Sequence, residues 1–296
     1  MKELVVISGK GGTGKTSIVA AFAALANNAV LADCDVDAAD LHLVLNPTVK
    51  QTTDFSGGKQ ASIIAEKCIG CRKCQDLCKF DAIKLDGPAN DLVAKTYRVD
   101  PISCEGCKVC VEFCPVDAIE FNDQINGQWF ISETRFGTMV HANLGIAEEN
   151  SGKLVSLIRR ETKQIAEEQK KDLVIVDGSP GIGCPVIASI TGADLVLIVT
   201  EPTLSGKHDL ERVAELAAGF GMPVLVAINK FDLNPDMAEQ IEQDARKRNI
   251  KVVGKIRYDK AFTKAQIAKQ SIVEYTSGAV TEDIKALWRN VTYALG

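Results

Sequence analysis

Apolar residues along this chain gather in short runs, separated by longer stretches in which apolar positions recur at helical spacing. Such short runs, bounded by turn residues, are typical of buried parallel strands, and the longer patterns are typical of the helices that cover them. The predicted strands are Leu4–Ser8, Ala29–Ala32, Asp172–Val176, Leu195–Thr200, Val224–Asn229 and Val252–Ile256. The predicted helices are approximately Lys15–Asn27, Gly152–Lys170, Gly206–Gly219, Pro235–Asn249 and Thr281–Leu295.

This order of strands and helices predicts an α/β fold with a mostly parallel sheet that is covered by helices on both faces. The segment Gly127–Ala142 alternates apolar and polar residues, and it is predicted to be a hairpin that returns the chain to the sheet. The polar residues that follow open the helix at about Gly152, with Asn150 or Ser151 as a candidate N-cap.

The region from about Asp54 to Phe121 departs from this pattern and contains eight of the ten cysteines. They form two runs, Cys68-x2-Cys71-x2-Cys74-x3-Cys78 and Cys104-x2-Cys107-x2-Cys110-x3-Cys114-Pro115. This spacing is the two-cluster bacterial ferredoxin pattern, in which three cysteines of one run and the last cysteine of the other hold each [4Fe–4S] cluster. The predicted ligands are Cys68, Cys71, Cys74 and Cys114 for cluster 1, and Cys104, Cys107, Cys110 and Cys78 for cluster 2.

Two other uses of cysteine fit this pattern less well. A disulfide framework is typical of secreted chains, and the sequence opens with a short strand pattern rather than a secretory signal. Zinc sites use Cys-x2-Cys pairs, but they rarely add a third cysteine at the next x2 interval and a fourth at x3. We therefore expect one discontinuous α/β domain, residues 1–54 and 122–296, with a two-cluster α+β ferredoxin domain inserted at residues 55–121.

A phosphate-binding loop follows the first predicted strand. The segment Gly9–Thr16, GKGGTGKT, matches GxxxxGK[ST] between a strand and a helix, which is the context that a P-loop requires. Backbone N–H groups of Gly11 to Lys15 are expected to surround the β-phosphate. The predicted nucleotide contacts are Gly9, Lys10, Gly11, Gly12, Thr13, Gly14, Lys15, Thr16 and Ser17. Lys15 is expected to reach the β- and γ-phosphates, and Thr16 to ligate Mg²⁺.

The loop contains a lysine besides Lys15, namely Lys10, and this residue narrows the class of P-loop protein. The loop resembles the deviant Walker A motif of the MinD/ParA/Mrp-type P-loop ATPases, which include the nitrogenase iron protein. The resemblance continues at Asp33-Cys34-Asp35, which is similar to switch I, and at Asp177-Gly178-Ser179-Pro180-Gly181, which is similar to the switch II motif DxxPG. With its cysteine-rich insertion, the chain resembles the subgroup of MinD-superfamily ATPases that have an inserted ferredoxin domain. This resemblance covers essentially the whole chain.

The resemblance also implies roles for individual residues. Lys10 would cross a homodimer interface to the partner's nucleotide, Asp35 would position the attacking water, Asp33 would support Mg²⁺, and Asp177 would hold Mg²⁺ through water. Asn229, at the end of its strand, would read adenine. The segment Asn229-Lys230-Phe231-Asp232 also has the NKxD form that GTPases use to read guanine, so GTP is an alternative to ATP.

Two cysteines lie outside the paired runs. Cys184 follows Asp177 by seven residues, the offset at which the nitrogenase iron protein has a cluster-bridging cysteine. One cysteine per subunit supplies only two of the four ligands that a cluster takes, so a buried, inert thiol is the competing reading. Cys34 lies between the switch I aspartates.

Composition limits the partners. The formal charge of −5 argues against nucleic acid as a partner. No apolar stretch approaches the roughly 20 residues that span a bilayer, so we expect a cytoplasmic protein without stable membrane insertion. The sequence thus predicts an ATP- and Mg²⁺-dependent dimeric switch that passes electrons through two [4Fe–4S] clusters to a redox or iron–sulfur protein. The alternatives are an iron–sulfur cluster carrier and a redox-sensing regulatory ATPase.

Overall fold

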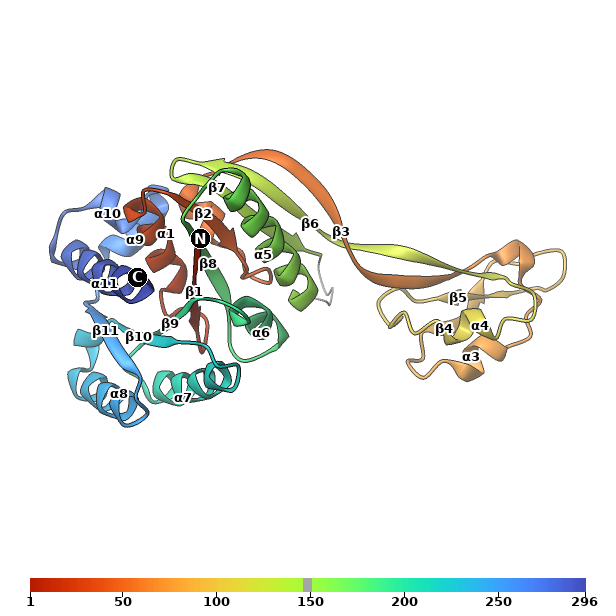
Figure 1. The fold of residues 1–296 in the computed structure, drawn as a ribbon. Helices are drawn as coiled ribbons and strands as arrows, with labels where there is room; N and C mark the ends of the chain where they lie inside the picture. The colour runs from red at the N-terminus through yellow and green to blue at the C-terminus, as the bar shows by residue number, and fades with distance from the viewer. Residues whose placement is uncertain (146–150) are drawn as a thin grey trace. The chain divides into compact units, whose positions relative to one another are not determined.

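The computed structural model of the protein describes residues 1–145 and 151–296 and falls into two units (Figure 1). Unit 1 comprises Met1–Thr53, Gln128–Leu144 and Ser151–Gly296, and unit 2 comprises Asp54–Gly127 together with Gly145. The candidate N-cap Asn150 lies outside the described residues. No helix in the described ranges is long and apolar enough to cross a membrane.

A nine-stranded sheet has the strand order β11-β10-β9-β1-β8-β2-β7-β6-β3. Its strands are β1 (Lys2–Ser8), β2 (Ala29–Asp33), β3 (Thr48–Ile63), β6 (Ile119–Thr134), β7 (Gly137–Leu144), β8 (Leu173–Pro180), β9 (Leu195–Thr200), β10 (Val224–Asn229) and β11 (Lys251–Ile256). The pairings of β1 with β8 and β9, of β2 with β7 and β8, and of β10 with β9 and β11 are all parallel. The predicted mostly parallel α/β sheet is confirmed.

Helices cover both faces of this sheet. On one face α1 (Lys15–Leu25) packs on β1 and β8, and α11 (Ala279–Leu295) packs on β11. On the other face lie α5 (Ser151–Glu168), α6 (Cys184–Ile190), α7 (Leu204–Gly219) and α8 (Pro235–Lys247) (Figure 1). Alternate residues of β1 serve the two sides: Leu4 and Val6 belong to the core beneath α1, while the equally buried Val5 and Ile7 point to the opposite side.

The structure contains elements that the hydrophobic pattern did not predict. The short helices α2 (Leu41–Leu45), α9 (Ala261–Ile267) and α10 (Ile272–Tyr275) fall in stretches too brief to show helical periodicity. Strand β3 was missed because most of its side chains are exposed, so it lacks an apolar face. The predicted hairpin is present as β6 and β7, joined through Arg135 and Phe136, but β6 begins earlier than expected, at Ile119.

Unit 2 shows its internal repeat in the backbone as well as in the sequence. It contains α3 (Lys73–Leu77), α4 (Val109–Glu112) and the antiparallel pair β4 (Ile83–Gly87) and β5 (Thr96–Val99). Residues with positive φ recur at matching positions, namely Gly70 and Gly106, Arg72 and Lys108, and Asp81 and Asp117. Each pair has the sequence separation of Cys68 and Cys104, so the two cysteine runs share one backbone course.

A buried ion pair joins β1 to the helices on one face. The Glu3 carboxylate accepts hydrogen bonds from Arg159 Nε at 2.9 Å and Nη2 at 2.5 Å, and Lys163 lies 2.9 Å away. Arg159 Nη1 also donates to the carbonyl oxygens of Ala188 and Thr191 at the end of α6. One guanidinium therefore connects β1, α5 and α6.

We expect Arg159→Met to lower the free energy of unfolding by about 3 kcal/mol, because it leaves the Glu3 carboxylate buried without its main partner. Chemical denaturation checks this value. Arg160→Met on the same helix is the matched control, since Arg160 is exposed and its loss is expected to change stability by at most about 0.5 kcal/mol. Equal effects of the two substitutions would contradict the assignment.

Candidate functional site

The carboxyl ends of the parallel strands in unit 1 meet at a cleft of about 460 Å³, within the size range of small-molecule sites. The P-loop forms one side: Gly12 and Gly14 adopt positive φ, and α1 begins at Lys15. No side chain caps the N-terminus of α1. Its first N–H groups therefore remain available for an anion such as a phosphate.

Lys15 lies at the centre of a buried charge cluster. Its Nζ is 2.6 Å from Asp177 Oδ1 and 3.3 Å from Asp35 Oδ2, and the lysine itself is only 5% exposed. Burial alone lowers the pKa of Lys15, but attraction to Asp177, Asp35 and Asp33 outweighs it and raises the pKa above its usual value. The ammonium group is therefore held in its charged form, as a phosphate-binding lysine requires.

The acidic residues outnumber this lysine. Burial, followed by repulsion from Asp177, raises the pKa of Asp33 well above its usual value, and burial also raises the pKa of Asp35 although Lys15 opposes it. Two buried oxygens, Asp177 Oδ2 and Thr13 Oγ1, have no hydrogen-bond partner. An excess of carboxylates with an unpartnered buried oxygen fits a hard divalent cation such as Mg²⁺.

The two switch-like segments are in contact. Asp33 accepts hydrogen bonds from the backbone N–H groups of Asp35 and Leu41, and this fixes the turn after β2. Ser179 Oγ donates to the Cys34 carbonyl oxygen at 2.6 Å, and the Gly181 N–H donates to Ser8 O at 2.9 Å. The residues after β1, β2 and β8 thus form one hydrogen-bonded edge.

Asn229 supports the P-loop. Its Nδ2 donates to Thr13 O at 2.7 Å, and its Oδ1 accepts the N–H of Lys230 at 3.0 Å. A side chain on Gly14 would collide with the Asn229 amide, so glycine is required there for the close approach as well as for its φ of 92°. Asp232 Oδ1 accepts the N–H of Tyr258 at 2.7 Å. The first and last residues of the NKxD segment, Asn229 and Asp232, are therefore both hydrogen-bonded within the protein itself.

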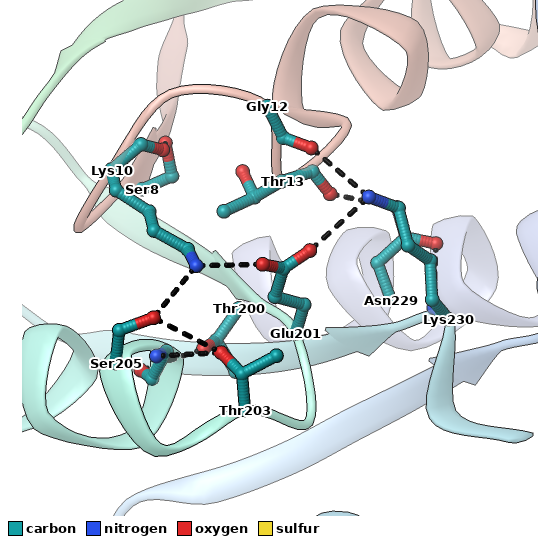
Figure 2. Close-up of polar contacts among 11 residues, drawn as sticks. Ser8, Lys10, Gly12, Thr13, Thr200, Glu201, Thr203, Ser205, Asn229 and Lys230 are labelled. Carbon is teal, nitrogen blue, oxygen red and sulfur yellow. Dashed lines mark hydrogen bonds and ion pairs between the residues drawn. The ribbon is translucent and has the colours of Figure 1, made fainter. Parts of the chain in front are cut away.

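Figure 2 shows where Lys10 lies in the single chain. Its Nζ is 2.7 Å from Glu201 Oε1 and donates to Ser205 Oγ at 2.8 Å. Glu201 Oε2 is 3.1 Å from Lys230 Nζ, which also donates to Gly12 O. Although burial raises the pKa of Glu201, hydrogen bonds from the two lysines bring it below its usual value.

Sequence reasoning missed several residues of this cleft. Glu201 is not among the lining residues but pairs with Lys230, which is one of them. It directly follows the buried strand β9, and a polar residue at a strand's carboxyl end is the signal that could have identified it. The far wall is formed after β11 by residues with no recognisable motif. They are Arg257, Tyr258, Asp259, Phe262, Thr263 and Gln266.

Unit 2 contains two apolar cavities that cysteines line. Cavity 1 is lined by Cys68, Cys71, Cys74 and Cys114, together with residues that include Ile69 and Tyr97. Cavity 2 is lined by Cys78, Cys104, Cys107 and Cys110, together with residues that include Phe80 and Val99. Each cavity therefore gathers three cysteines of one run and the last cysteine of the other, which is the ligand division of a two-cluster ferredoxin.

All ten cysteines are free thiols, so the structure contains no disulfide framework. Within residues 1–145 and 151–296 no three His, Cys, Asp or Glu side chains are arranged to hold a single metal ion. The two cysteines outside unit 2 lie in unit 1. Cys34 is fully buried, and burial raises its thiol pKa well above the usual value, whereas Cys184 is exposed at the first residue of α6.

A parallel sheet with a glycine loop, an uncapped helix N-terminus and a buried lysine among carboxylates defines a P-loop nucleotide-binding protein. A profile of the CobQ/CobB/MinD/ParA nucleotide binding domain matches residues 4–272, and the chain belongs to that family. The predicted membership of the MinD/ParA class of P-loop ATPases, and with it the predicted ATPase, is confirmed.

Individual proteins agree with this membership. An uncharacterized protein of Methanocaldococcus jannaschii is 36% identical over 235 residues, which are 78% of this chain and 79% of the relative. Among solved structures, the cell division ATPase MinD of Pyrococcus furiosus aligns with a TM-score of 0.59 at 17% identity, covering 99% of this chain and 98% of that one. The septum site-determining protein MinD of Pyrococcus horikoshii, complexed with Mg-ADP, aligns with a TM-score of 0.59 at 16% identity, covering 100% and 97%.

We expect Asn229→Ala to lower the free energy of unfolding by about 1–3 kcal/mol, because it leaves the buried Thr13 carbonyl unsatisfied, and to weaken nucleotide binding through the loosened P-loop. Thermal denaturation with and without nucleotide measures both effects. Asn234→Ala is the control: it removes the N-cap of α8, costs about 1 kcal/mol and leaves nucleotide affinity unchanged. Unaltered nucleotide binding by Asn229→Ala would contradict this role.

Proposed function

We propose that the protein is a nucleotide-switched homodimeric ATPase that couples ATP hydrolysis to electron transfer through two [4Fe–4S] clusters to a protein partner. The observation that carries this proposal is the presence, in one chain, of a nucleotide cleft with a buried lysine–carboxylate cluster and of two cavities that each collect four cysteines in the ferredoxin division.

Hydrolysis in this cleft rests on positioning and charge. The free N–H groups at the start of α1 bind the phosphates, and Lys15 exchanges part of its contact with Asp177 and Asp35 for the phosphate oxygens. Asp35, released from Lys15, orients the attacking water. Thr16 and Asp177 would hold Mg²⁺, which supplies positive charge to the β- and γ-phosphates.

ATP is favoured over GTP. The carboxylate of Asp232, which a GTPase would turn toward guanine, already accepts a hydrogen bond from the Tyr258 N–H. The base would instead lie against the wall after β11, where Tyr258 and Phe262 offer aromatic surface. The solved MinD of P. horikoshii, which carries Mg-ADP, supports an adenine nucleotide for this chain.

The dimeric state is proposed from Lys10. Its ammonium group does not enter its own cleft but lies against Glu201 and Ser205, so it has no role within the single chain's phosphate site. A second subunit that presents a nucleotide phosphate would compete with Glu201 for this lysine. Dimerisation would thus release Glu201 from Lys10. Glu201 also pairs with Lys230, which donates to the P-loop carbonyl oxygen of Gly12, so these contacts would change as well.

Resident clusters, rather than clusters in transit, are supported by the completeness of the two cysteine sets. Each cavity offers the four thiols that a [4Fe–4S] cluster takes as ligands, and most of the other lining residues are apolar. A carrier would need a labile or incomplete site. In this chain only Cys184 is an exposed thiol outside these sets.

We expect Lys15→Ala to reduce ATP hydrolysis by at least about 100-fold, because it removes the cation that compensates phosphate charge. Lys10→Ala is expected to retain Mg-ATP binding while losing ATP-dependent dimerisation. Steady-state phosphate release and light scattering after size-exclusion chromatography measure these effects. Lys247→Ala, on an exposed helix end, is the control. Hydrolysis that survives Lys15→Ala would refute the assignment of the cleft.

Substitution of one cysteine tests the cluster assignment. Anaerobically reconstituted protein is expected to bind about eight iron atoms, and Cys71→Ala about four, because one cluster loses a ligand. Cys184→Ala is the matched control and is expected to leave the iron content unchanged. A full iron content in Cys71→Ala, or a loss in Cys184→Ala, would contradict the division of ligands.

A further inference from the structure

The walls of the two cysteine cavities in unit 2 correspond at most positions through the internal repeat; the uncharged Pro115 lines cavity 1 alone, and the uncharged Gly106 and Val109 line cavity 2 alone. Cavity 1 uses Ile63, Tyr97, Val116, Ala118 and Ile119, and cavity 2 uses Val99, Ala61, Phe80, Ala82 and Ile83 at the matching positions. All of these residues are uncharged, so the walls they form cannot distinguish the clusters electrostatically. Differences in charge must come from the remaining positions.

One pair of charged wall residues is balanced between the cavities. Arg72 lines cavity 1 and Lys108 occupies the matching position in cavity 2. Each adopts positive φ just before its helix, and each forms an ion pair with an acid one turn later, Arg72 with Asp76 and Lys108 with Glu112. These charges therefore act alike on the two sites.

A second pair of matching wall residues carries an unequal charge. Ile69 follows the first cysteine of its run and lines cavity 1, whereas Glu105 follows the first cysteine of the other run and lines cavity 2. This is the single wall position at which the two cavities, both within the described residues, differ in formal charge. Glu105 is exposed, so its field is partly screened, but it lies beside one cavity only.

A hydrogen bond to a ligand sulfur also favours a higher reduction potential in cavity 1 than in cavity 2. The backbone N–H of Ala118 donates to Cys114 Sγ at 3.3 Å, and Cys114 belongs to cavity 1. An N–H donated to a ligand sulfur stabilises the more negative, reduced cluster, whereas a neighbouring carboxylate destabilises it. Cavity 1 thus favours reduction on two counts.

We propose, building on the proposed function, that the cluster in cavity 2 has the lower reduction potential and that Glu105 is the residue that sets the difference. An electron from a one-electron protein donor that reduces the cavity 2 cluster would then pass to the cavity 1 cluster, oxidising the first and reducing the second. Transfer from the cluster in cavity 2 to the cluster in cavity 1 would be downhill, so the electron would rest on the cluster in cavity 1.

The test is a redox titration of the reconstituted full-length chain, followed by the electron paramagnetic resonance of the reduced clusters. Glu105→Gln keeps the shape and removes the charge, and it is expected to shift the lower midpoint potential upward while leaving the higher one in place. Ile69→Glu is the reciprocal variant and is expected to shift the higher midpoint downward. Iron content and visible absorption confirm that each variant holds both clusters.

Two results would overturn the proposal. If both midpoints are unmoved in Glu105→Gln, or if they move together, Glu105 does not distinguish the clusters, although the proposed function stands because the clusters are present. A chain that incorporates no [4Fe–4S] cluster under these conditions refutes the proposed function and this inference with it. Glu120→Gln, an exposed residue of unit 2 that lies outside both cavity walls, controls for the loss of an acid.

Discussion

The structure of unit 1 depends on a lysine buried among carboxylates. Lys15, at the start of α1, is paired with Asp177 of β8 and with Asp35 just after β2, and all three side chains are largely buried. Burying a charge is costly unless it is paired, so the ends of β1, β2 and β8 must keep their register for the cluster to exist. The hydrogen bonds of Asp33, Ser179 and Gly181 maintain that register.

The same arrangement suits a switch. Asp177 and Asp35 pair with Lys15. In the proposed mechanism a phosphate would compete with them for this lysine, and the exchange of partners would reach the segments after β2 and β8. Lys10, outside the cleft, is likewise paired with a carboxylate, that of Glu201, and Lys230 pairs with the same carboxylate. Both lysines of the loop are thus engaged within the chain, and each has a carboxylate that binding would release.

Unit 2 follows a different constraint. It is too small to build a large core, and its buried cluster of Cys68, Ile83, Tyr97 and Ala118 is surrounded by cysteines rather than by further aliphatic side chains. The two cavities come from one duplicated backbone pattern, so sequence differences within the repeat, such as Ile69 against Glu105, translate directly into different surroundings for the two sets of thiols.

The sequence by itself determined the parallel α/β class, the P-loop and most of the buried strands, because short apolar runs and a glycine-rich turn are local signals. Strand β3 and the helices α2, α9 and α10 were not predictable in this way, since their positions depend on neighbours rather than on their own periodicity. The spacing of the cysteines predicted two sets of four, and in the folded structure the same two sets line two cavities. Only the tertiary structure decided what Lys10, Asn229 and Asp232 contact. Their partners Glu201, Thr13 and Tyr258 lie in other loops, far away in the chain, and a motif contains no information about contacts made at that distance.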